Sequence, residues 1–503
     1  MISPRTRLGL EIAAVGVAAG VAGDALLRAV PWGLNLTLCT TALVAAAVLL
    51  ARRHSLTPGP DAPWLGATAV LLGAAFLRRD AAVLASFDVV ALLMTLALGA
   101  ASLQGEHIMK WRTLDYVRGG ATAAVASSVG ALVLAGHDVQ WRELPREGRL
   151  RHVRAVALGV ALAAPLLVVF AGLFASADQV FGNLLANLLG GAFDAEAVFT
   201  HTFLICAWAA LVAGYLRWSF FGRPVALPAA ASNAALGIVP VGTALGLLNL
   251  LFLTFVVVQL RYFFGGVGMV EETIGLTYAQ YARRGFFELV TVSGLVLPVL
   301  LAADYLVRGE APARIALFRR LAGLMLALLV VIMASALQRM RLYVDAFGLS
   351  EIRLYATAFM IYLLGVFAWF GWTVLRGSPR RERFAFGALM HGFAVLAGLH
   401  VLNPDAFIVR TNLSRPAAEH PFDAEYALTL GADAVPLLLD ALPRFPAEDQ
   451  CAVAAGLLKR WSPTDKRDWR SWNWSRSRAT RLVADRAEAL RSTARQVHCK
   501  VVT

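Results

Sequence analysis

The sequence consists largely of apolar runs that are long enough to cross a lipid bilayer. A membrane-spanning helix needs about 20 predominantly apolar residues, and about twelve runs, give or take two, approach that length. They are residues 8–30, 32–51, 62–78, 81–103, 116–136, 153–175, 198–217, 237–260, 285–307, 317–337, 354–375 and 384–402. None shows the alternation of a membrane β-barrel strand. The pattern therefore predicts an all-α fold, a polytopic transmembrane helix bundle.

Charged residues are scarce and clustered. Only 16% of the 503 residues are charged, whereas soluble domains carry roughly a quarter. The formal net charge is +13, but the basic residues lie in short clusters between the apolar runs, as in the positive-inside loops of membrane proteins. The placement of the charge therefore predicts that the protein contacts the lipid bilayer. It predicts no nucleic-acid partner.

The composition changes at residue 403, after the last apolar run. The tail beyond it is polar, mixed in charge and broken by prolines. Residues 433–445 and 447–461 predict two short amphipathic helices. Tryptophans then interleave with arginines in a segment that can lie among lipid headgroups or pack against the rest of the tail. We predict a transmembrane helical bundle at 1–402 and a polar helical C-terminal domain at 403–503.

The loop charges and the number of spans disagree about where the tail lies. From residue 142 onward, the loop charges alternate and place the tail outside the cytoplasm, because the loop at 176–197 has no Lys or Arg. Counting twelve spans from a cytoplasmic N-terminus places it inside. We give more weight to the loop charges. The number of spans predicted in the first 136 residues is then wrong by one, through a missed span or an extra one. The arginine-rich segments that favour the cytoplasm are 52–54, 142–151, 217–223, 308–320 and 376–383.

Motifs for familiar chemistry are missing. The sequence has no GxxxxGK[ST] phosphate loop, no HExxH, no GxSxG and no strand-linked GxGxxG. Cys39 and Cys206 fall within apolar runs, while Cys451 and Cys499 of the tail can pair only in an oxidising compartment. Without a CxxC or Cys/His cluster, no zinc site is expected. We predict no metal, no cofactor and no catalytic residue, and enzymatic activity stays open.

Acidic residues within the apolar runs are costly and must face the bundle interior, a cavity or a partner. The intramembrane acids are Asp24, Asp88 and Asp304. For Asp88 the alternatives are a neutral side chain, pairing with another helix, or a proton or ligand path, and we favour pairing. Glu288 follows Arg284 by four residues, and an ion pair on one helix face is the favoured interpretation.

Residues 335–355, SALQRMRLYVDAFGLSEIRLY, crowd polar groups between two apolar runs. Gly348 predicts the stop between two helices, and Arg341 and Asp345 are spaced to pair. Two other polar clusters, the loop at 261–284 and the start of the tail at 403–415, are expected on the same side of the membrane.

These three clusters predict one polar layer. Guanidinium forks beside tyrosine hydroxyls suit an anionic ligand or a lipid headgroup, but they can equally bind acids and hold the tail against the bundle. We favour docking of the tail over a ligand site. The candidate residues are Arg261, Glu271, Glu272, Arg284, Glu288, Arg339, Arg341, Tyr343, Asp345, Arg353, Asp405 and Arg410.

Several segments are distinctive in combination. They are FASADQVFGNLL (174–185), YARRGFFELVTVSGL (281–295), QRMRLYVDAFGLSEIRLYA (338–356), NPDAFIVRTNLSR (403–415) and DAEYALTLGADAVPLL (423–438). In this order they resemble a bacterial family of multi-pass membrane proteins known only as a domain of unknown function, of the 4153/4173 type. The resemblance runs from about residue 150 to about residue 480. It implies an integral protein of the bacterial cytoplasmic (inner) membrane and carries over no catalytic residue.

Three classes of function stay open. A non-enzymatic envelope sensor, regulator or scaffold with a docked tail comes first, because chemistry motifs are missing. A transporter would use the buried acids, although no inverted repeat or pair of interrupted spans is evident. A membrane enzyme would act on anionic or lipid-linked substrates at the arginine clusters. Protein partners are not predicted.

Overall fold

The fold was analysed in a computed structural model. It describes residues 2–143, 163, 167, 170–174, 177–188, 195–222, 237–264, 286–307, 310–377, 381–416, 421–462 and 468–495. All regular elements in these residues are helices, which confirms the all-α prediction. Ten of the described helices are long and apolar enough to cross a membrane. They are α1 (Pro4–Leu27), α2 (Leu34–Arg53), α4 (Ala82–Leu103), α5 (Thr113–Val133), α8 (Ala195–Phe221), α9 (Ile238–Phe264), α12 (Phe286–Leu306), α13 (Pro312–Phe347), α14 (Glu351–Phe370) and α15 (Phe384–Leu402).

Two of the predicted runs differ from these spans. The run at 62–78 forms α3 (Ala62–Ala75), which has only 14 residues. It begins at a proline-containing first turn and ends before the polar loop at 76–81. The run at 153–175 lies largely outside the described residues.

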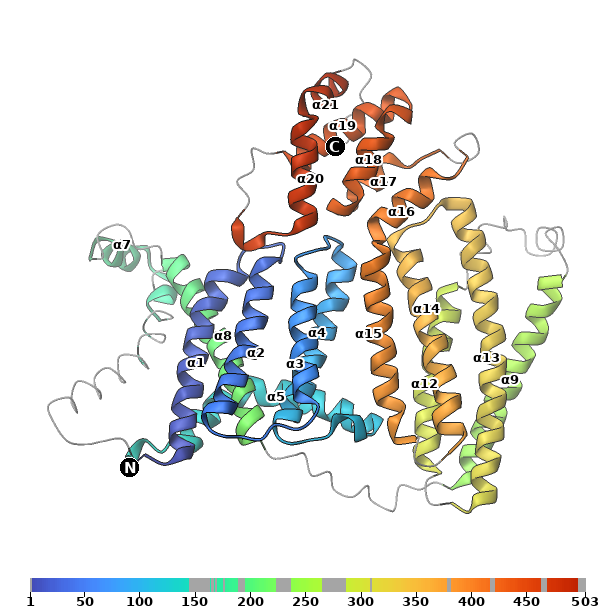
Figure 1. The fold of residues 1–503 in the computed structure, drawn as a ribbon, viewed down its shortest axis with the longest axis horizontal. Helices are drawn as coiled ribbons and strands as arrows, with labels where there is room; N and C mark the ends of the chain where they lie inside the picture. The colour runs from blue at the N-terminus through green and yellow to red at the C-terminus, as the bar shows by residue number, and fades with distance from the viewer. Residues whose placement is uncertain are drawn as a thin grey trace.

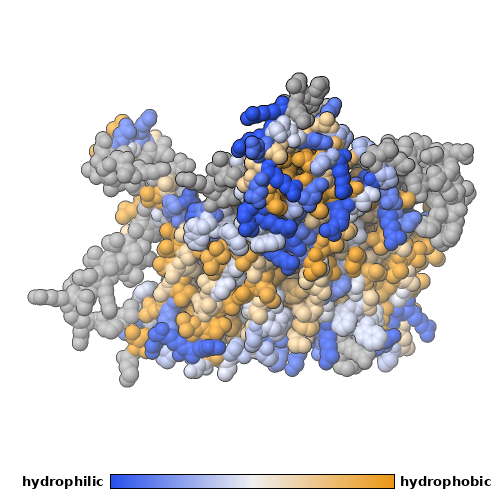
Figure 2. Space-filling model, turned by 45° about the horizontal axis from the view of Figure 1, so that its top comes forward, coloured by the Kyte–Doolittle hydropathy of each residue, from blue (hydrophilic) through white to orange (hydrophobic). Residues whose placement is uncertain are grey.

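The tail forms a compact group of short helices over one end of the bundle, the tail side (Figure 1). The N-terminus lies at the opposite end, the N-terminal side. Figure 2 shows hydrophobic residues around the bundle below the hydrophilic surface of the tail. The tail helices are α16 (Pro404–Leu413), α17 (Ala424–Thr429), α18 (Val435–Ala441), α19 (Ala447–Trp461), α20 (Trp474–Asp485) and α21 (Ala487–Ala494).

The bundle consists of two groups of helices. Helices α1–α5 and α8 form the first, and α9 and α12–α15 form the second, with α15 packing against α4 where they meet. Within the first group, small residues let α1 and α8 approach closely, as is common between membrane helices. A Cβ on Gly20 would lie 2.4 Å from the Ile205 carbonyl oxygen. In the second group, large apolar side chains such as Phe318 and Phe370 fill the core.

Helix α5 does not pass from one side of the bundle to the other. At its start, Arg112 lies 3.8 Å from Glu382, in the connection between α14 and α15 on the N-terminal side. At its end, the buried Asp138 lies 2.5 Å from Arg5 and from Arg217, which are on the same side. Figure 1 shows α5 lying across its neighbours at the N-terminal side of the bundle.

This placement explains why the loop charges and the number of spans disagree. The run at 116–136 has the length and apolarity of a span, and sequence alone gives no reason to treat it differently. Because both of its ends lie on one side, it does not reverse the direction of the chain. The N-terminus and the tail consequently lie on opposite sides of the bundle, as the loop charges require.

We expect both ends of α5 to be labelled from the same face of the membrane. In a chain with Cys39 and Cys206 replaced by serine, His107→Cys and Gln140→Cys should react with an impermeant maleimide from one face. Val30→Cys, in the exposed loop between α1 and α2, should react from the other. Labelling of positions 107 and 140 from opposite faces would show that α5 is a true span.

Candidate functional site

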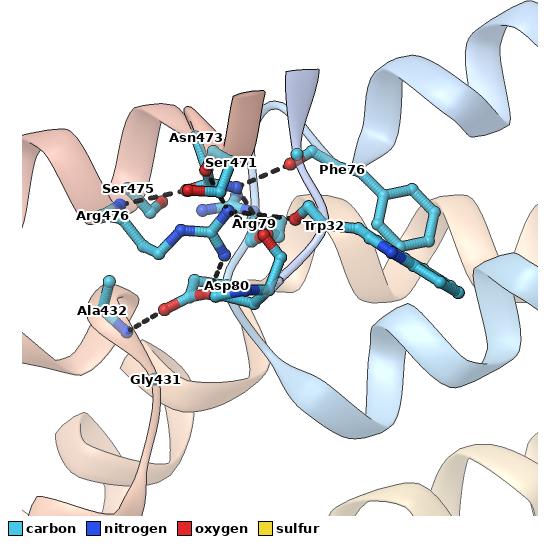
Figure 3. Close-up of polar contacts among 12 residues, drawn as sticks. Trp32, Phe76, Arg79, Asp80, Gly431, Ala432, Ser471, Asn473, Ser475 and Arg476 are labelled. Carbon is cyan, nitrogen blue, oxygen red and sulfur yellow. Dashed lines mark hydrogen bonds and ion pairs between the residues drawn. The ribbon is translucent and has the colours of Figure 1, made fainter. Parts of the chain in front are cut away.

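The strongest cluster of polar contacts lies where the tail meets the loop at 76–81 between α3 and α4. Asn473 begins α20, and its side-chain oxygen accepts a hydrogen bond from the Arg476 amide, as a helix N-cap does. Its side-chain nitrogen donates to the carbonyls of Phe76 and Arg79, at 2.7 and 2.9 Å. One buried amide therefore both starts a tail helix and binds the bundle (Figure 3).

Arg476 extends from α20 into the same loop. Its guanidinium group donates to the Asp80 carboxylate at 2.6 Å, and the side chain is only 9% exposed. The group also donates to the carbonyls of Trp32, in the loop between α1 and α2, and Ser471. A buried guanidinium group needs such acceptors because it has left water.

A second ion pair crosses the interface in the reverse sense. Arg79 of the bundle donates to Asp433 of the tail at 3.0 Å, and its other nitrogens donate to the His400 carbonyl at the end of α15. The second oxygen of Asp433 accepts from the backbone amide of Asp80. Each side thus contributes one arginine and one aspartate. We call the residues that carry these contacts the tail lock, namely Arg79, Asp80, Asp433, Asn473 and Arg476.

Two glycines let the backbones of tail and bundle touch. A Cβ on Gly431 would lie 1.7 Å from the Asp80 carbonyl oxygen, and one on Gly33 would lie 2.3 Å from the Trp472 carbonyl oxygen. The amide of Leu34 donates to that same Trp472 carbonyl. Both positions need glycine because no side-chain atom fits between the two backbones.

Asp405, in α16 under the lock, is 1% exposed. One oxygen accepts from the Gly431 amide at 2.8 Å, and the other has no hydrogen-bond partner in the described part of the chain. Burial raises the pKa of this carboxyl to about 7, with the Gly431 amide opposing the rise and the carboxylates of Glu351, Asp433 and Asp80 adding to it. Asp405 therefore titrates near neutral pH.

The loop at 335–355 is arranged differently from the predicted polar layer. Arg353 donates to the carbonyls of Phe347 and Gly348, which is the usual role of an arginine at a helix C-terminus. Its guanidinium carbon also lies 4.0 Å from the centre of the Tyr343 ring. Arg353 therefore serves the end of α13 and leaves the tail to other residues.

The start of the tail does contact this loop. Asn412 of α16 makes two hydrogen bonds with the backbone of Leu349, accepting at 2.6 Å and donating at 2.9 Å. Arg415 donates to the carbonyl of Asp345, and the Tyr426 hydroxyl accepts from the Glu351 amide. The tail is thus joined to both helix groups, but here through backbone atoms and not through the predicted carboxylates.

Of the other residues of the predicted polar layer, Asp345 takes part in this contact through its backbone carbonyl. Arg341 and Asp345 do not form an ion pair with each other in the described chain, and Arg339 is half-buried. The backbone of Arg261 belongs to α9, but its side chain is outside the described residues, as are Glu271, Glu272 and Arg284. The exposed members of the set are Glu288, Arg341, Asp345 and Arg410.

Two of the intramembrane acids contact histidines on other helices. Asp88 of α4 is 2% exposed and lies 2.9 Å from the Nε2 atom of His400 on α15. Asp24 of α1 lies 2.6 Å from the Nδ1 atom of His201 on α8. Asp304 of α12 is buried. The described residues contain no group of His, Cys, Asp and Glu side chains that could hold a metal ion.

Sequence reasoning pointed to docking of the tail but missed the residues of the tail lock. Its partners across the interface are 353 to 396 positions apart in the chain, so no local spacing reveals them. One signal was present. The sequence RRD at 78–80 sits between two apolar runs in a connection too short to be an ordinary solvated loop. Such a connection must satisfy its charges with another part of the molecule.

We expect Asp405 to make tail docking pH-dependent. Because the carboxyl pKa rises from about 3.9 when exposed to about 7 when docked, ionisation opposes docking progressively between about pH 4 and pH 7, and the effect levels off above pH 7. Asp405→Asn keeps an acceptor for the Gly431 amide but cannot ionise. Relative to the variant, wild type should lose tail protection by up to about tenfold per pH unit across that window. Proteolysis rates of the purified proteins measure this, and parallel pH profiles would contradict it.

The chain was compared with known proteins in three ways. Residues 66–441 match the model of a family described as a domain of unknown function (DUF4153). The match runs from α3 to the end of α18 and covers more than half of the 503 residues, which confirms the resemblance predicted from the sequence. Neither the curated proteins nor the solved structures contain a match. The chain is therefore a multi-pass membrane protein that belongs to the DUF4153 family.

Proposed function

We propose that this protein is a non-enzymatic envelope sensor or scaffold of the bacterial cytoplasmic membrane. In this proposal the tail, residues 403–503, is a separate extracytoplasmic domain docked on a transmembrane domain, residues 1–402. The tail lock carries the proposal, because two reciprocal ion pairs join the tail to the bundle.

The polar character of the lock suits reversible docking. A buried ion pair loses hydration when it forms, and its net contribution to stability is small compared with an apolar contact of the same size. When the tail separates, water can solvate both arginines and both aspartates again. The lock therefore fixes one docked arrangement without making it permanent, as a sensor or a regulated scaffold requires.

Two observations support an extracytoplasmic tail. Arg52 and Arg53 at the end of α2, and Arg376, Arg381 and Arg383 between α14 and α15, lie on the side opposite the tail, and clustered arginines mark the cytoplasmic side. In addition, Cys451 of α19 is disulfide-bonded, whereas Cys39 and Cys206 of the spans are free. Structural disulfides persist in oxidising compartments.

Exposed tryptophans support a tail that rests on the bilayer surface. Trp469, Trp472 and Trp474 are 62%, 44% and 44% exposed, and they lie in the segment that contacts the tail-side ends of α2 and α3. Indole rings concentrate at the membrane–water interface because they are apolar with one polar N–H. Arg470 lies among them and can meet lipid phosphate.

We expect Arg476→Ala to release the tail. The change leaves Asp80 buried without its partner, which costs about 3–5 kcal/mol for a buried pair. Protease cleavage of the tail in purified protein should accelerate by about tenfold or more, while the bundle stays resistant. Arg478→Ala is the matched control, because Arg478 lies on the same helix and stacks on Trp474 at 5.5 Å without entering the lock.

Equal cleavage of the two variants would contradict docking through the lock. The sensor or scaffold proposal also predicts a result in cells. In a deletion strain, Arg476→Ala should fail to restore the wild-type phenotype, whereas Arg478→Ala should restore it. If a released tail restores the phenotype fully, a transporter or an enzyme in the bundle becomes the better proposal.

We expect the C-terminus to lie outside the cytoplasm. An alkaline phosphatase fused there should be active, and a green fluorescent protein fused there should stay dark. Fusions after Arg53, at the end of α2 on the N-terminal side, should give the reverse pattern and serve as the control. A fluorescent C-terminal fusion would place the tail in the cytoplasm.

A further inference from the structure

The bundle side of the tail lock presents two opposite charges on neighbouring residues. Arg79 donates to the Asp433 carboxylate at 3.0 Å, and Asp80 accepts from the Arg476 guanidinium group at 2.6 Å. Because Arg79 and Asp80 are consecutive in the loop at 76–81, their charges lie side by side (Figure 3). We call these two residues the loop site. The tail supplies the opposite charge to each of them.

The bundle itself orients the cationic half of the loop site. The Nε and Nη2 atoms of Arg79 donate to the His400 carbonyl at 3.0 and 2.8 Å, which leaves Nη1 to donate to the Asp433 carboxylate. The backbone amide of Asp80 donates to the second oxygen of that carboxylate at 3.0 Å. One guanidinium nitrogen and one amide therefore hold a carboxylate at two points. Since His400 belongs to α15, these donors keep their support when the tail leaves.

The anionic half of the loop site decides which occupant fits. The two oxygens of the Asp80 carboxylate accept from the tail, one from Arg476 and the other from the Ala432 amide at 3.1 Å. Release of the tail removes both donors. The Asp80 charge then repels a simple anion that approaches Arg79. An occupant that satisfies both residues carries a carboxylate together with a cationic N–H donor.

The docked tail leaves no room at the loop site for any other molecule. Asp433 and Arg476 are each 8% exposed, so the tail covers its own two charges. A Cβ on Gly431 would overlap the Asp80 carbonyl oxygen, which shows how closely the tail backbone approaches the loop. Another occupant can reach the loop site only after the tail has moved away. Its binding and tail docking therefore exclude each other.

We propose that Arg79 and Asp80 bind a small zwitterion of the amino-acid class, for which Asp433 and Arg476 of the tail are internal substitutes. The carboxylate of the ligand takes the place of the Asp433 carboxylate, and its ammonium or guanidinium group takes the place of the Arg476 group. The ligand releases the tail because it binds the released state alone. This inference rests on the proposed sensor function and names the class of ligand that the sensor recognises.

The first test measures protease cleavage of the tail in the full chain, held in phosphatidylglycerol nanodiscs at constant ionic strength. The probe is L-arginine at about 50 mM, because a tethered tail competes at an effective concentration in the millimolar range. Agmatine, which lacks the carboxylate, and succinate, which lacks the cation, are the matched controls. L-Arginine should accelerate cleavage by about threefold or more, and neither control should do so.

The second test measures binding of radiolabelled L-arginine to the Arg476→Ala variant. Its tail no longer competes, so binding should be about tenfold or more tighter than in the wild type. In this background Arg79→Gln should abolish binding, whereas Arg78→Gln, at the neighbouring arginine, should leave it unchanged. Asp80→Asn should exchange the preference from L-arginine to succinate, because the opposing carboxylate is gone. A folding defect cannot produce that gain of succinate binding.

Several results would overturn the proposal. Equal effects of the three probes would mean that the tail responds to solutes in general, and release by succinate alone would mean that the site binds simple anions. Release without any probe in nanodiscs that contain phosphatidylethanolamine would assign the site to a lipid headgroup. Faster cleavage of Arg476→Ala without L-arginine binding contradicts the ligand and leaves docking intact. Unchanged cleavage of that variant contradicts docking itself, and the ligand with it.

Discussion

The arrangement of the whole tail depends on two arginines that have left water. Arg79 and Arg476 are each about nine-tenths buried, and a buried guanidinium group must find an acceptor for each of its nitrogens. No single loop offers that many. The chain meets the demand by bringing the loop at 76–81, the end of α15 and the start of α20 to one place. The tail is therefore positioned by the hydrogen-bonding needs of these cations as well as by the apolar contacts that Leu349 and Leu354 of the bundle make with the tail core.

The placement of the N-terminus and the tail at opposite ends of the bundle agrees with a smaller detail of the structure. Asp138, at the end of α5, is fully buried between Arg5 and Arg217. Because both arginines are on the N-terminal side, this pairing holds the end of α5 on the side from which the helix started. An apolar helix of spanning length is thus turned across the bundle by an ion cluster at one end and by Arg112 at the other. Because α5 starts and ends on one side, it does not reverse the chain, and the N-terminus and the tail therefore lie on opposite sides of the bundle.

The sequence-based predictions agree with the structure for features that residues close together in the chain determine. The need for internal hydrogen bonds in lipid makes every long apolar run helical, so the class of fold and most spans follow from composition. The site does not follow, because hydrogen bonds such as that of Asn473 with Phe76 join residues 397 positions apart. Arg353, within the expected cluster at 335–355, is a related case. Arg353 found its acceptors in the end of its own preceding helix, and helical spacing cannot distinguish a residue that serves a neighbouring carbonyl from one that reaches another domain.

One residue connects the membrane interior to the tail lock. The carbonyl of His400 accepts from Arg79, while its imidazole contacts Asp88 within the bundle. The neighbouring Leu399 lines an apolar groove between α4, α14 and α15, and Asp405 lies in the first turn of the next helix, five residues on. An occupant of that groove that shifted the end of α15 would move the His400 carbonyl, which accepts two of the three hydrogen bonds that Arg79 donates. Such an occupant would bias docking only to the extent that it binds the docked and released states differently, so coupling between the groove and the tail requires contacts at this end of α15.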